Sequence, residues 1–525
     1  MLPITWRGTS YANAGKVPMS AHGSLDPQAA FTDVDRRLFG GFVEHLGRHN
    51  YDGIHEPSHP TAGPDGFRRD VVELVRELGV STIRYPGGNF VSGYRWEDGV
   101  GPKDRRPRRL DLAWHSTETN EVGLHEFSDW LELVGSDLML AVNLGTRGTQ
   151  EALDLLEYAN LDAETAWTRQ RAEHGRPQPF GVGMWCLGNE MDGPWQLGHR
   201  NADDYGKLAS RTAKAMRMMQ PDLELVVCGS SGSGMPTFGS WERTVLEHTF
   251  EDVDFISCHS YYQERQGDAQ EFLASGVDMA RFIESVVAIA DSVAATKRSD
   301  KRIMISFDEW NVWYLFDENG EQDDKPAEAG WPVAPRLLED QYHALDAVVF
   351  GDLLITLLQH ADRVRSASLA QLVNVIAPIM TEPGGPAWRQ TTFHPFSLTS
   401  RLTGDRVVRV PLPDAGTVPS SRFGDVPALN AVATVGEAGT SVFVVNRSVG
   451  EAATLRLDVS ALIAELGREP RIAESHLLHE DDIYAANTLT DPERVGVAPI
   501  AGAVIREGVL EVPLPPVSWA ALLLS

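Results

Sequence analysis

Apolar and polar positions follow one pattern up to about residue 396 and a different pattern after it. From Leu38 to about Ile379, short apolar runs alternate with longer stretches in which apolar residues recur at helical spacing. The runs that predict strands are Leu38–Val43, Thr82–Tyr85, Leu138–Leu144, Val182–Leu187, Leu223–Cys228, Phe255–Cys258, Ile303–Phe307 and Ala367–Leu372. Helices are predicted between most of them, at Asp70–Leu78, Glu126–Val134, Ala202–Met219, Met279–Thr296 and Leu337–His360.

Strand and helix thus alternate about eight times, which predicts an α/β domain of the (β/α)8 TIM-barrel type. An open doubly wound sheet is the rival fold, because spacing alone does not exclude it. After about residue 396, short β-rich runs alternate with Gly, Pro and Asp turns, which is typical of an all-β, jelly-roll-like sandwich. Residues 1–30 lack periodicity, so we expect them to be mobile or to add a strand to the sandwich. The predicted organisation is a segment 1–30, a barrel 31–390 and a sandwich 391–525.

Two glutamates stand at the carboxyl ends of predicted barrel strands, where barrels of this type build their active sites. Glu190 follows the fourth strand, in Cys186-Leu187-Gly188-Asn189-Glu190, and Glu309 ends the seventh. Glycosidic cleavage needs such a pair, since one carboxyl group protonates the leaving oxygen while the other stays ionised. One such glutamate alone is most simply a surface charge. Two glutamates, each next to a Trp or Asn residue at the end of an apolar strand, favour a catalytic pair.

Other strand ends carry mainly uncharged donors and acceptors, as a polyhydroxylated ligand requires. They are Glu44, His45, Arg84, Asn89, Asn143, Asn189, His259, Ser260, Tyr261, Tyr262, Gln371 and Asn374. Trp114, Trp195, Trp310 and Trp313 offer apolar faces for sugar rings, although any one Trp is more often a packing residue. A phosphate group would fit poorly, since Arg84 is the only basic side chain among these strand-end residues apart from the histidines.

Composition narrows the partners and the compartment. The formal net charge of −28 argues against nucleic acid and against an anionic membrane surface. The longest apolar stretch, 348–358, is interrupted by Gly351 and Asp352 and is too short to span a bilayer. Three well-separated cysteines make a disulfide framework implausible. No secretory signal is evident in the first thirty residues, so we expect a cytoplasmic protein. The charged run 317–324 predicts a solvated loop.

Several motifs of other enzyme classes fail on inspection. His45-x-x-x-His49 has metal-like spacing but lacks the H-E-x-x-H order, so no metal site is predicted. The glycine-rich run 229–234 has the wrong order for a dinucleotide-binding loop. No G-x-S-x-G nucleophile elbow occurs in the sequence. These failures remove most rival enzyme classes.

Five segments closely resemble the α-L-arabinofuranosidases of glycoside hydrolase family 51. They are the motifs at Phe42–Arg48, Ile83–Phe90, Trp185–Trp195, Phe307–Tyr314 and Ala370–Ile379, in order and at family-like spacing. The resemblance runs from about Asp35 to the end. It implies a (β/α)8 barrel with a C-terminal β-sandwich, retaining hydrolysis of terminal arabinofuranosyl units, no cofactor, and usually a homo-hexamer.

The resemblance also implies roles for individual residues. Glu190 is similar to the acid/base of the family and Glu309 to the nucleophile. The residues similar to sugar contacts are Glu44, Arg84, Asn89, Asn189, Tyr261 and Gln371; Trp114 and Trp313 resemble walls of the site, and His259 a support for the catalytic pair. Ser260 departs from the family, which often has Gln there.

Two alternatives remain open from the sequence. One is a related barrel glycosidase acting on xylosyl or glucosyl units, because this fold hosts several specificities. The other is a sugar-binding protein without activity, which the intact pair Glu190 and Glu309 argues against. Linkage preference and natural substrate are not readable from the chain.

Overall fold

The computed structural model describes residues 19–316, 322 and 330–525. Most of the segment 1–30 (residues 1–18) and most of the charged run predicted to form a solvated loop (317–321, 323 and 324) lie outside the described residues. Within the described ranges, no helix is long and apolar enough to cross a membrane.

Eight parallel strands close into a barrel, which confirms the predicted fold and excludes the open sheet. In ring order they are β3 (Gly40–Phe42), β4 (Thr82–Tyr85), β7 (Asp137–Val142), β8 (Met184–Leu187), β9 (Glu224–Val227), β10 (Phe255–Tyr262), β11 (Met304–Val312) and β12 (Val364–Leu369). Each overlaps one of the eight predicted runs. All carboxyl ends therefore open on the same side of the ring.

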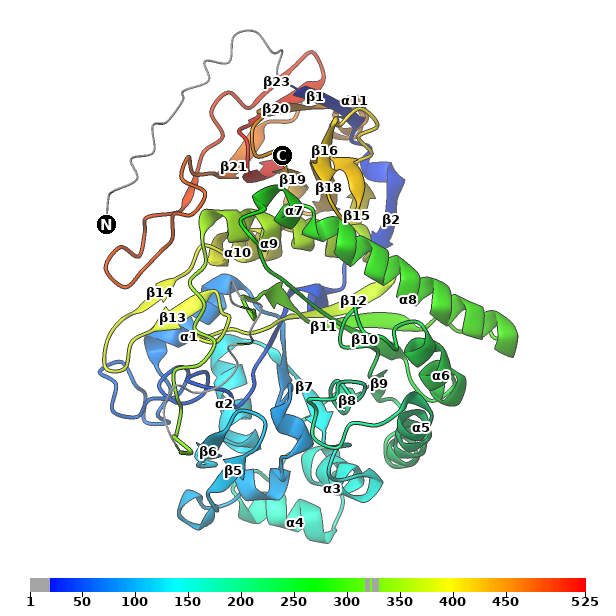
Figure 1. The fold of residues 1–525 in the computed structure, drawn as a ribbon, viewed down its shortest axis with the longest axis vertical. Coiled ribbons are helices and arrows are strands. Elements are labelled where there is room, and N and C mark those ends of the chain that lie inside the picture. Colours follow the sequence, from blue (N-terminus) through cyan, green and yellow to red (C-terminus); the bar gives the residue numbers. More distant parts are fainter. Residues whose placement is uncertain (1–18, 317–321, 323–329) are drawn as a thin grey trace, which may run out of the picture.

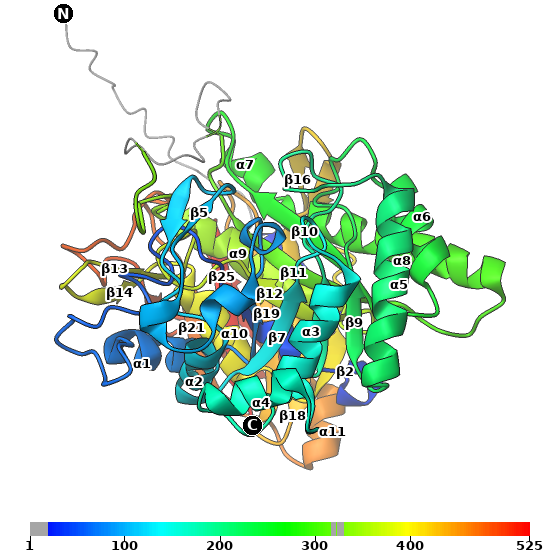
Figure 2. The ribbon, with the colours of Figure 1, turned by 90° about the horizontal axis from the view of Figure 1, so that it is seen from below.

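Helices surround the barrel on its outer face (Figures 1 and 2). They are α1 (Arg69–Leu78), α2 (Leu124–Val134), α3 (Thr149–Asn160), α4 (Ala166–Glu173), α5 (Ala202–Met219), α6 (Ser240–Thr249), α7 (Ala269–Phe272), α8 (Ser275–Lys297), α9 (Ala344–Gln359) and α10 (Phe393–Leu402). The five predicted helices correspond to α1, α2, α5, α8 and α9, whereas α3, α4, α6, α7 and α10 were not predicted. Figure 2 shows α5, α6 and α8 along one flank, where α6 contacts both neighbours.

The predicted start of α9 at Leu337 is wrong, because the helix begins only at Ala344. Leu338 has a positive φ of 54° and no helical neighbours. Leu337 and Leu338 are buried against Leu46, Trp114 and Ile376 near the carboxyl ends of the strands. These two residues are apolar because they pack in this cluster, and their spacing in the sequence resembles one more turn of the helix.

Two sheets form the second part of the molecule (Figure 1, top). One has the order β2-β15-β18-β19-β25-β21-β22 and the other β1-β20-β24-β23. Its strands are β1 (Met19–Ser24), β2 (Ala30–Asp33), β15 (Arg406–Arg409), β18 (Leu429–Gly436), β19 (Gly439–Asn446), β20 (Ala453–Asp458), β21 (Ile472–Leu478), β22 (Val497–Ala498), β23 (Val504–Arg506), β24 (Val509–Leu514) and β25 (Ser518–Leu524).

The chain reaches this sandwich from both of its ends. Strand β1 pairs in parallel with β20, and β2 pairs antiparallel with β15. Strand β2 therefore spans the expected domain boundary at residue 31. A separate apolar core, which includes Ala21, Val442, Leu455 and Leu522, lies between the two sheets.

Helix α9 joins the two parts. It packs on the barrel strand β11 and on β18, β19 and β25 of the sandwich. It is buried from Ala344 to Leu358, as expected for a helix that is apolar on all sides. Gly351 permits the closest approach, because a Cβ there would lie 2.3 Å from Cδ1 of Trp519. Beside it, Asp352 forms a buried ion pair with Arg447, at 2.8 Å between Nη2 and Oδ2.

Candidate active site

A cavity of about 280 Å³ opens at the carboxyl ends of the barrel strands. Most of the predicted site residues line it: Glu44, Asn89, Trp114, Glu190, Tyr261, Glu309, Trp313 and Gln371. The other three, Arg84, Asn189 and His259, are buried and contact the two glutamates or their neighbours. The structure therefore brings every predicted site residue into one region.

Glu190 stands in the loop that follows β8. Its backbone is in the left-handed region, with φ of 42°, a strained conformation that is most often kept at functional sites. Its Oε2 accepts a hydrogen bond from Nε1 of Trp195 at 2.7 Å, and its Oε1 lies 2.9 Å from Nδ1 of His259. Both oxygens are thus fixed while one face of the carboxyl group borders the cavity.

Glu309 lies within β11 and is 4% exposed. Arg84 donates from Nη1 to Oε1 at 2.8 Å, and the Tyr261 hydroxyl donates to Oε2 at 2.8 Å. Burial raises the pKa of the Glu309 carboxyl, and the positive charges of His259 and Arg84 oppose that rise. Donors to both oxygens favour the ionised form that a nucleophile requires.

Asp308, beside Glu309, was not predicted as a site residue. Its Oδ1 lies 3.0 Å from Nε2 of His259, so the imidazole bridges Asp308 and Glu190. Neighbouring residues of a regular strand point to opposite faces, but here the register shifts between Phe307 and Trp310 along β12. This irregularity lets both carboxylates reach the same histidine. The only sequence signal was the position of Asp308 next to Glu309.

The carboxyl groups around His259 favour its protonated form. Burial lowers the pKa of His259, but Glu309, Asp308 and Glu190 outweigh it and raise that pKa to about 10. His259 and Arg84 are therefore both cationic at neutral pH. They offset negative charge that would otherwise be uncompensated in a buried site, through the contacts of His259 with Asp308 and of Arg84 with Glu309.

Glu44 lines the same cavity and follows β3. Its Oε1 accepts from the Trp114 indole at 2.7 Å and from the Phe90 amide at 2.8 Å. Gln371 donates from Nε2 to Oε2 at 3.3 Å and accepts at Oε1 from the Glu44 amide. Burial raises the pKa of Glu44 well above its ordinary value, although the bonds from Trp114 and Phe90 oppose this.

Some polar residues at strand ends take no part in the cavity. His45 bonds to Glu118 and Tyr85, and His49 bonds to Gln371, so the two histidines do not converge on a shared ligand. Asn143 is held by Tyr94 and Thr146, and Asn374 by Arg48 and Thr381. Cavity residues that the sequence did not single out include Leu112, Ala113, Ser231, Leu315 and Leu338.

Among the described residues, Glu190, His259 and Glu309 form one group that could hold a metal ion, with one ligand atom from each lying within 4.8 Å of the others. Both nitrogens of His259 already face carboxylates, and Arg84 already neutralises Glu309. A divalent cation would have to displace the proton of a strongly basic histidine beside a fixed guanidinium. The donor set thus fits proton transfer better than metal binding.

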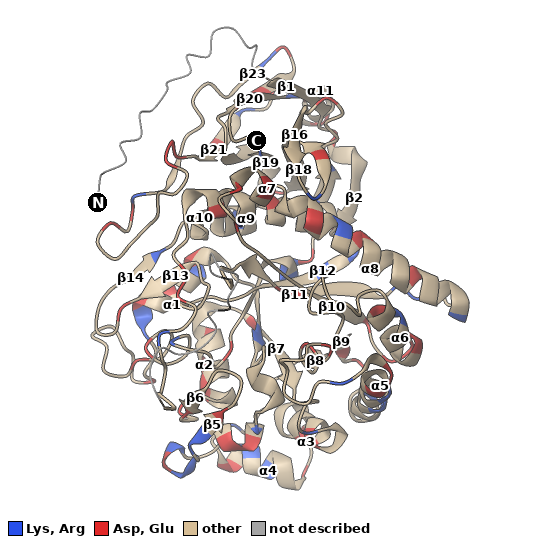
Figure 3. Ribbon diagram, viewed as in Figure 1, with Lys and Arg blue, Asp and Glu red and all other residues tan. Residues whose placement is uncertain are grey.

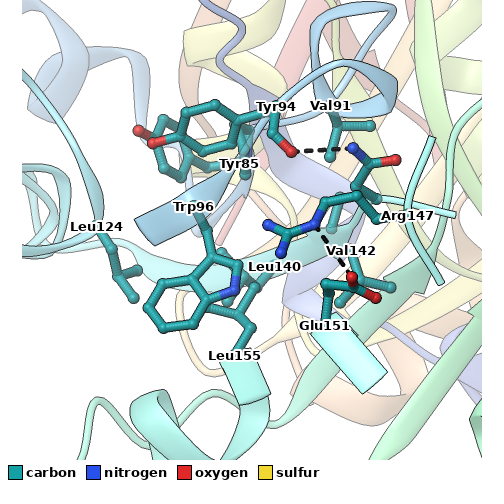
Figure 4. Close-up of a pocket in the computed structure, with 13 residues that line it drawn as sticks. Tyr85, Val91, Tyr94, Trp96, Leu124, Leu140, Val142, Arg147, Glu151 and Leu155 are labelled. Carbon is teal, nitrogen blue, oxygen red and sulfur yellow. Dashed lines mark hydrogen bonds and ion pairs between the residues drawn. The ribbon is translucent and has the colours of Figure 1, made fainter. Parts of the chain in front are cut away.

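A small internal hollow, shown in Figure 4, lies between β4, β7, α2 and α3. Tyr94, Trp96 and Leu155 line it, and Arg147 reaches toward Glu151 at its edge. Its volume of about 30 Å³ has room for water but is too small for a sugar.

The comparisons with known proteins agree with this geometry. The family models for the α-L-arabinofuranosidase 1 domain and the α-L-arabinofuranosidase C-terminal domain match residues 74–275 and 308–518. The chain is 60% identical to an exo-α-(1→6)-L-arabinofuranosidase of Bifidobacterium longum, covering 95% of this chain and 96% of that protein. It is 54% identical to an intracellular exo-α-(1→5)-L-arabinofuranosidase of Streptomyces lividans, covering 96% of this chain and 75% of the relative.

A solved structure gives the same result in three dimensions. The family 51 α-L-arabinofuranosidase AbfB of Bifidobacterium longum superimposes with a TM-score of 0.90 at 48% identity, covering 97% of this chain and 99% of that one. The similarity therefore includes both the barrel and the sandwich. This chain belongs to the family 51 α-L-arabinofuranosidases.

Proposed function

We propose that this enzyme removes terminal, non-reducing α-L-arabinofuranosyl units from arabinan, arabinoxylan or their oligosaccharides, with retention of configuration. One observation carries the mechanism: Glu190 and Glu309 each place a carboxylate oxygen within 4.8 Å of the other and share His259. Retaining glycosidases keep their carboxyl groups about 5–5.5 Å apart, whereas inverting enzymes need a wider gap for water.

In this proposal Glu309 attacks the anomeric carbon while Glu190 protonates the departing oxygen. Arg84 and Tyr261 keep Glu309 ionised, and the positive charge of His259 stabilises the two carboxylates when Glu190 loses its proton. Glu190 then removes a proton from water, which releases the sugar from Glu309. The amide Nδ2 of Asn189 is buried and has no partner among the described residues, so it is free to donate to a sugar hydroxyl.

Exo action is part of this proposal. Trp114 and Gln371 each donate a hydrogen bond to Glu44, and all three line the cavity. Asn89 and Trp313 also line the cavity. In this proposal these groups surround the terminal arabinofuranosyl ring, so that no chain extends beyond it on the non-reducing side. Debranched arabinan should therefore release monomeric arabinose first, and early accumulation of longer products would contradict exo action.

The reaction itself is tested with aryl α-L-arabinofuranosides, followed by proton NMR. The first product formed should be the α-anomer, and aryl xylosides and glucosides should be poor substrates. Glu190→Ala should retain far more of the first step with a dinitrophenyl leaving group than with an oligosaccharide, because only the sugar alcohol needs an acid. Added azide should accelerate this variant and give an α-glycosyl azide. A β-configured first product would overturn the proposal.

The relatives bear on the compartment in which the enzyme acts and on its oligomeric state. We propose a cytoplasmic enzyme that receives oligosaccharides, since the relatives from Streptomyces lividans and Bacillus subtilis are named intracellular. We further propose a homo-hexamer, on the family resemblance alone. Sedimentation of the purified protein tests the assembly.

A further inference from the structure

A second cavity, of about 210 Å³, lies beside the active-site cavity. Three segments of the chain line both hollows with neighbouring residues. Asn89 lines the active-site cavity and Phe90 the second one; Trp195 lines the first and Leu197 the second. Leu112 lines both. The two cavities are therefore separated by little more than one side chain.

The position of the second cavity relates it to the departing part of the substrate. Trp195 donates to Oε2 of Glu190, so it marks the side on which the proposed acid meets the leaving oxygen. Leu197, two residues further along, belongs to the second cavity. Glu44 and Gln371, which would hold the arabinofuranosyl ring, are absent from its lining. A substrate chain that leaves past Trp195 thus arrives at this cavity.

The lining has the mixed character of a sugar site. Leu110 and Leu112 are large apolar side chains that are 55% and 61% exposed. Arg95 is exposed and has no side-chain partner among the described residues, and Arg109 pairs with Asp98 at 2.8 Å. Asn120 is 1% exposed, and its Oδ1 is a buried acceptor with no partner in the described part of the chain. Such an orphaned acceptor is costly unless a ligand or water donates to it.

We propose that this second cavity binds a sugar of the leaving chain, namely the unit next to the one bonded to the scissile oxygen. Its ring would lie on Leu110 and Leu112, while its hydroxyls bond to Arg95 and to Oδ1 of Asn120. The cavity, at about 210 Å³, is large enough for one neutral pentose. The inference rests on the proposed function, because it requires Glu190 to mark the leaving-group side.

The test measures kcat/KM for an aryl arabinofuranoside and for arabino-oligosaccharides of two, three and four units. In the wild-type enzyme the trisaccharide should exceed the disaccharide by about tenfold, the effect of one well-formed subsite, and the tetrasaccharide should add little. Arg95→Ala and Leu110→Ser should each remove most of that trisaccharide advantage. The aryl arabinofuranoside has no group that reaches the cavity, so it serves as the internal reference for each variant.

Matched controls lie on distant surfaces. Arg211→Ala removes an exposed arginine from α5, and Leu466→Ser alters an apolar residue that is 40% exposed in α11 (Ser460–Leu466). Both controls should keep the trisaccharide advantage. The inference is overturned if trisaccharide and disaccharide react alike in the wild type, if the advantage survives in Arg95→Ala and Leu110→Ser, or if both substrates lose equally. Failure on the aryl arabinofuranoside itself would instead reject the proposed function.

Discussion

At Glu309, two hydrogen-bond donors and a nearby cationic histidine hold one carboxylate at the mouth of the barrel. Glu309→Ala should lower kcat on every substrate by on the order of 10⁴-fold or more, because no covalent intermediate can then form. Steady-state rates on an activated aryl arabinofuranoside measure this. A variant that keeps a tenth of the wild-type kcat, with contamination excluded, would contradict the assignment.

Asp308 should act through His259 and reveal itself by pH dependence. The pKa of His259 is about 10 in the folded protein against an ordinary 6.5, so the folded state binds a proton that the unfolded state loses between these values. Stability from this group is complete below pH 6.5 and is lost as the pH rises toward 10. Asp308→Asn lowers the folded pKa, so its unfolding free energy should fall less steeply with pH over this window.

The same variant separates positioning from mere packing. We expect Asp308→Asn to lower kcat more than it raises KM, and to move the alkaline limb of the kcat profile to lower pH. Urea unfolding at pH 6.5, 8 and 9.5 gives the stability comparison. Parallel wild-type and variant curves, with an unchanged kcat profile, would show that Asp308 does not control the charge of His259.

Residues could be predicted from the sequence where strand ends alone determined their position. Glu190 and Glu309 each follow or end an apolar run, and the closed barrel brings their strands to one mouth. Asp308 could not be predicted, because its contact with His259 depends on a register shift in β11 that no residue type signals. The hydrogen bond from Trp195 to Glu190 depends likewise on the left-handed turn at Glu190.

Among the elements, α9 is the one most constrained by packing, and Gly351 is its closest contact. Gly351→Ala would drive a methyl group into Trp519, so it should destabilise the protein by about 1–3 kcal/mol although alanine is the better helix former. Gly450→Ala is the control, since nothing lies within 4 Å of that position. Urea unfolding compares the two, and an unchanged or higher stability for Gly351→Ala would mean that the two packed layers readily separate.

Elements were predicted correctly where the apolar residues of a segment all packed as part of that element, and incorrectly where they did not. The strands of the barrel are largely buried on both faces, so several of them, such as β7 and β8, appear as nearly continuous apolar runs. Helix α4 was missed because it is largely polar, with Thr168 and Arg171 as its only buried residues. The predicted extension of α9 was wrong because Leu337 and Leu338 belong to a buried cluster with Trp114 and not to a helix face.

On the scale of the whole molecule, one buried ion pair links the barrel to the sandwich. Arg447→Met would leave the Asp352 carboxylate buried, with Asn430 as its one remaining side-chain partner in the described part of the chain, so we expect a loss of about 3–5 kcal/mol. Replacing both residues, Asp352→Leu with Arg447→Met, should restore most of that loss, because no charge is then left unpaired. A double-mutant cycle in urea measures the coupling; additive losses would contradict it.

Charge on the same scale explains which partners the sequence excluded. Acidic side chains outnumber basic ones over both parts of the molecule, and the basic residues are scattered among them (Figure 3). A neutral sugar chain is not repelled by such a surface, whereas a polyphosphate would be. The sequence predicted this from its net charge, but it could not predict the second cavity, which is formed by segments around residues 90, 110 and 197.

The pairing of β1 with β20 and of β2 with β15 has a consequence for how the protein is made. Residues 19–33 leave the ribosome before the barrel does, yet their partners at 406–409 and 453–458 are synthesised more than 370 residues later. The barrel between them can complete its ring while these first strands still wait for their neighbours. A nascent chain stalled before β15 should therefore contain a protease-resistant barrel and a cleavable leading segment, which becomes protected only when translation passes residue 458.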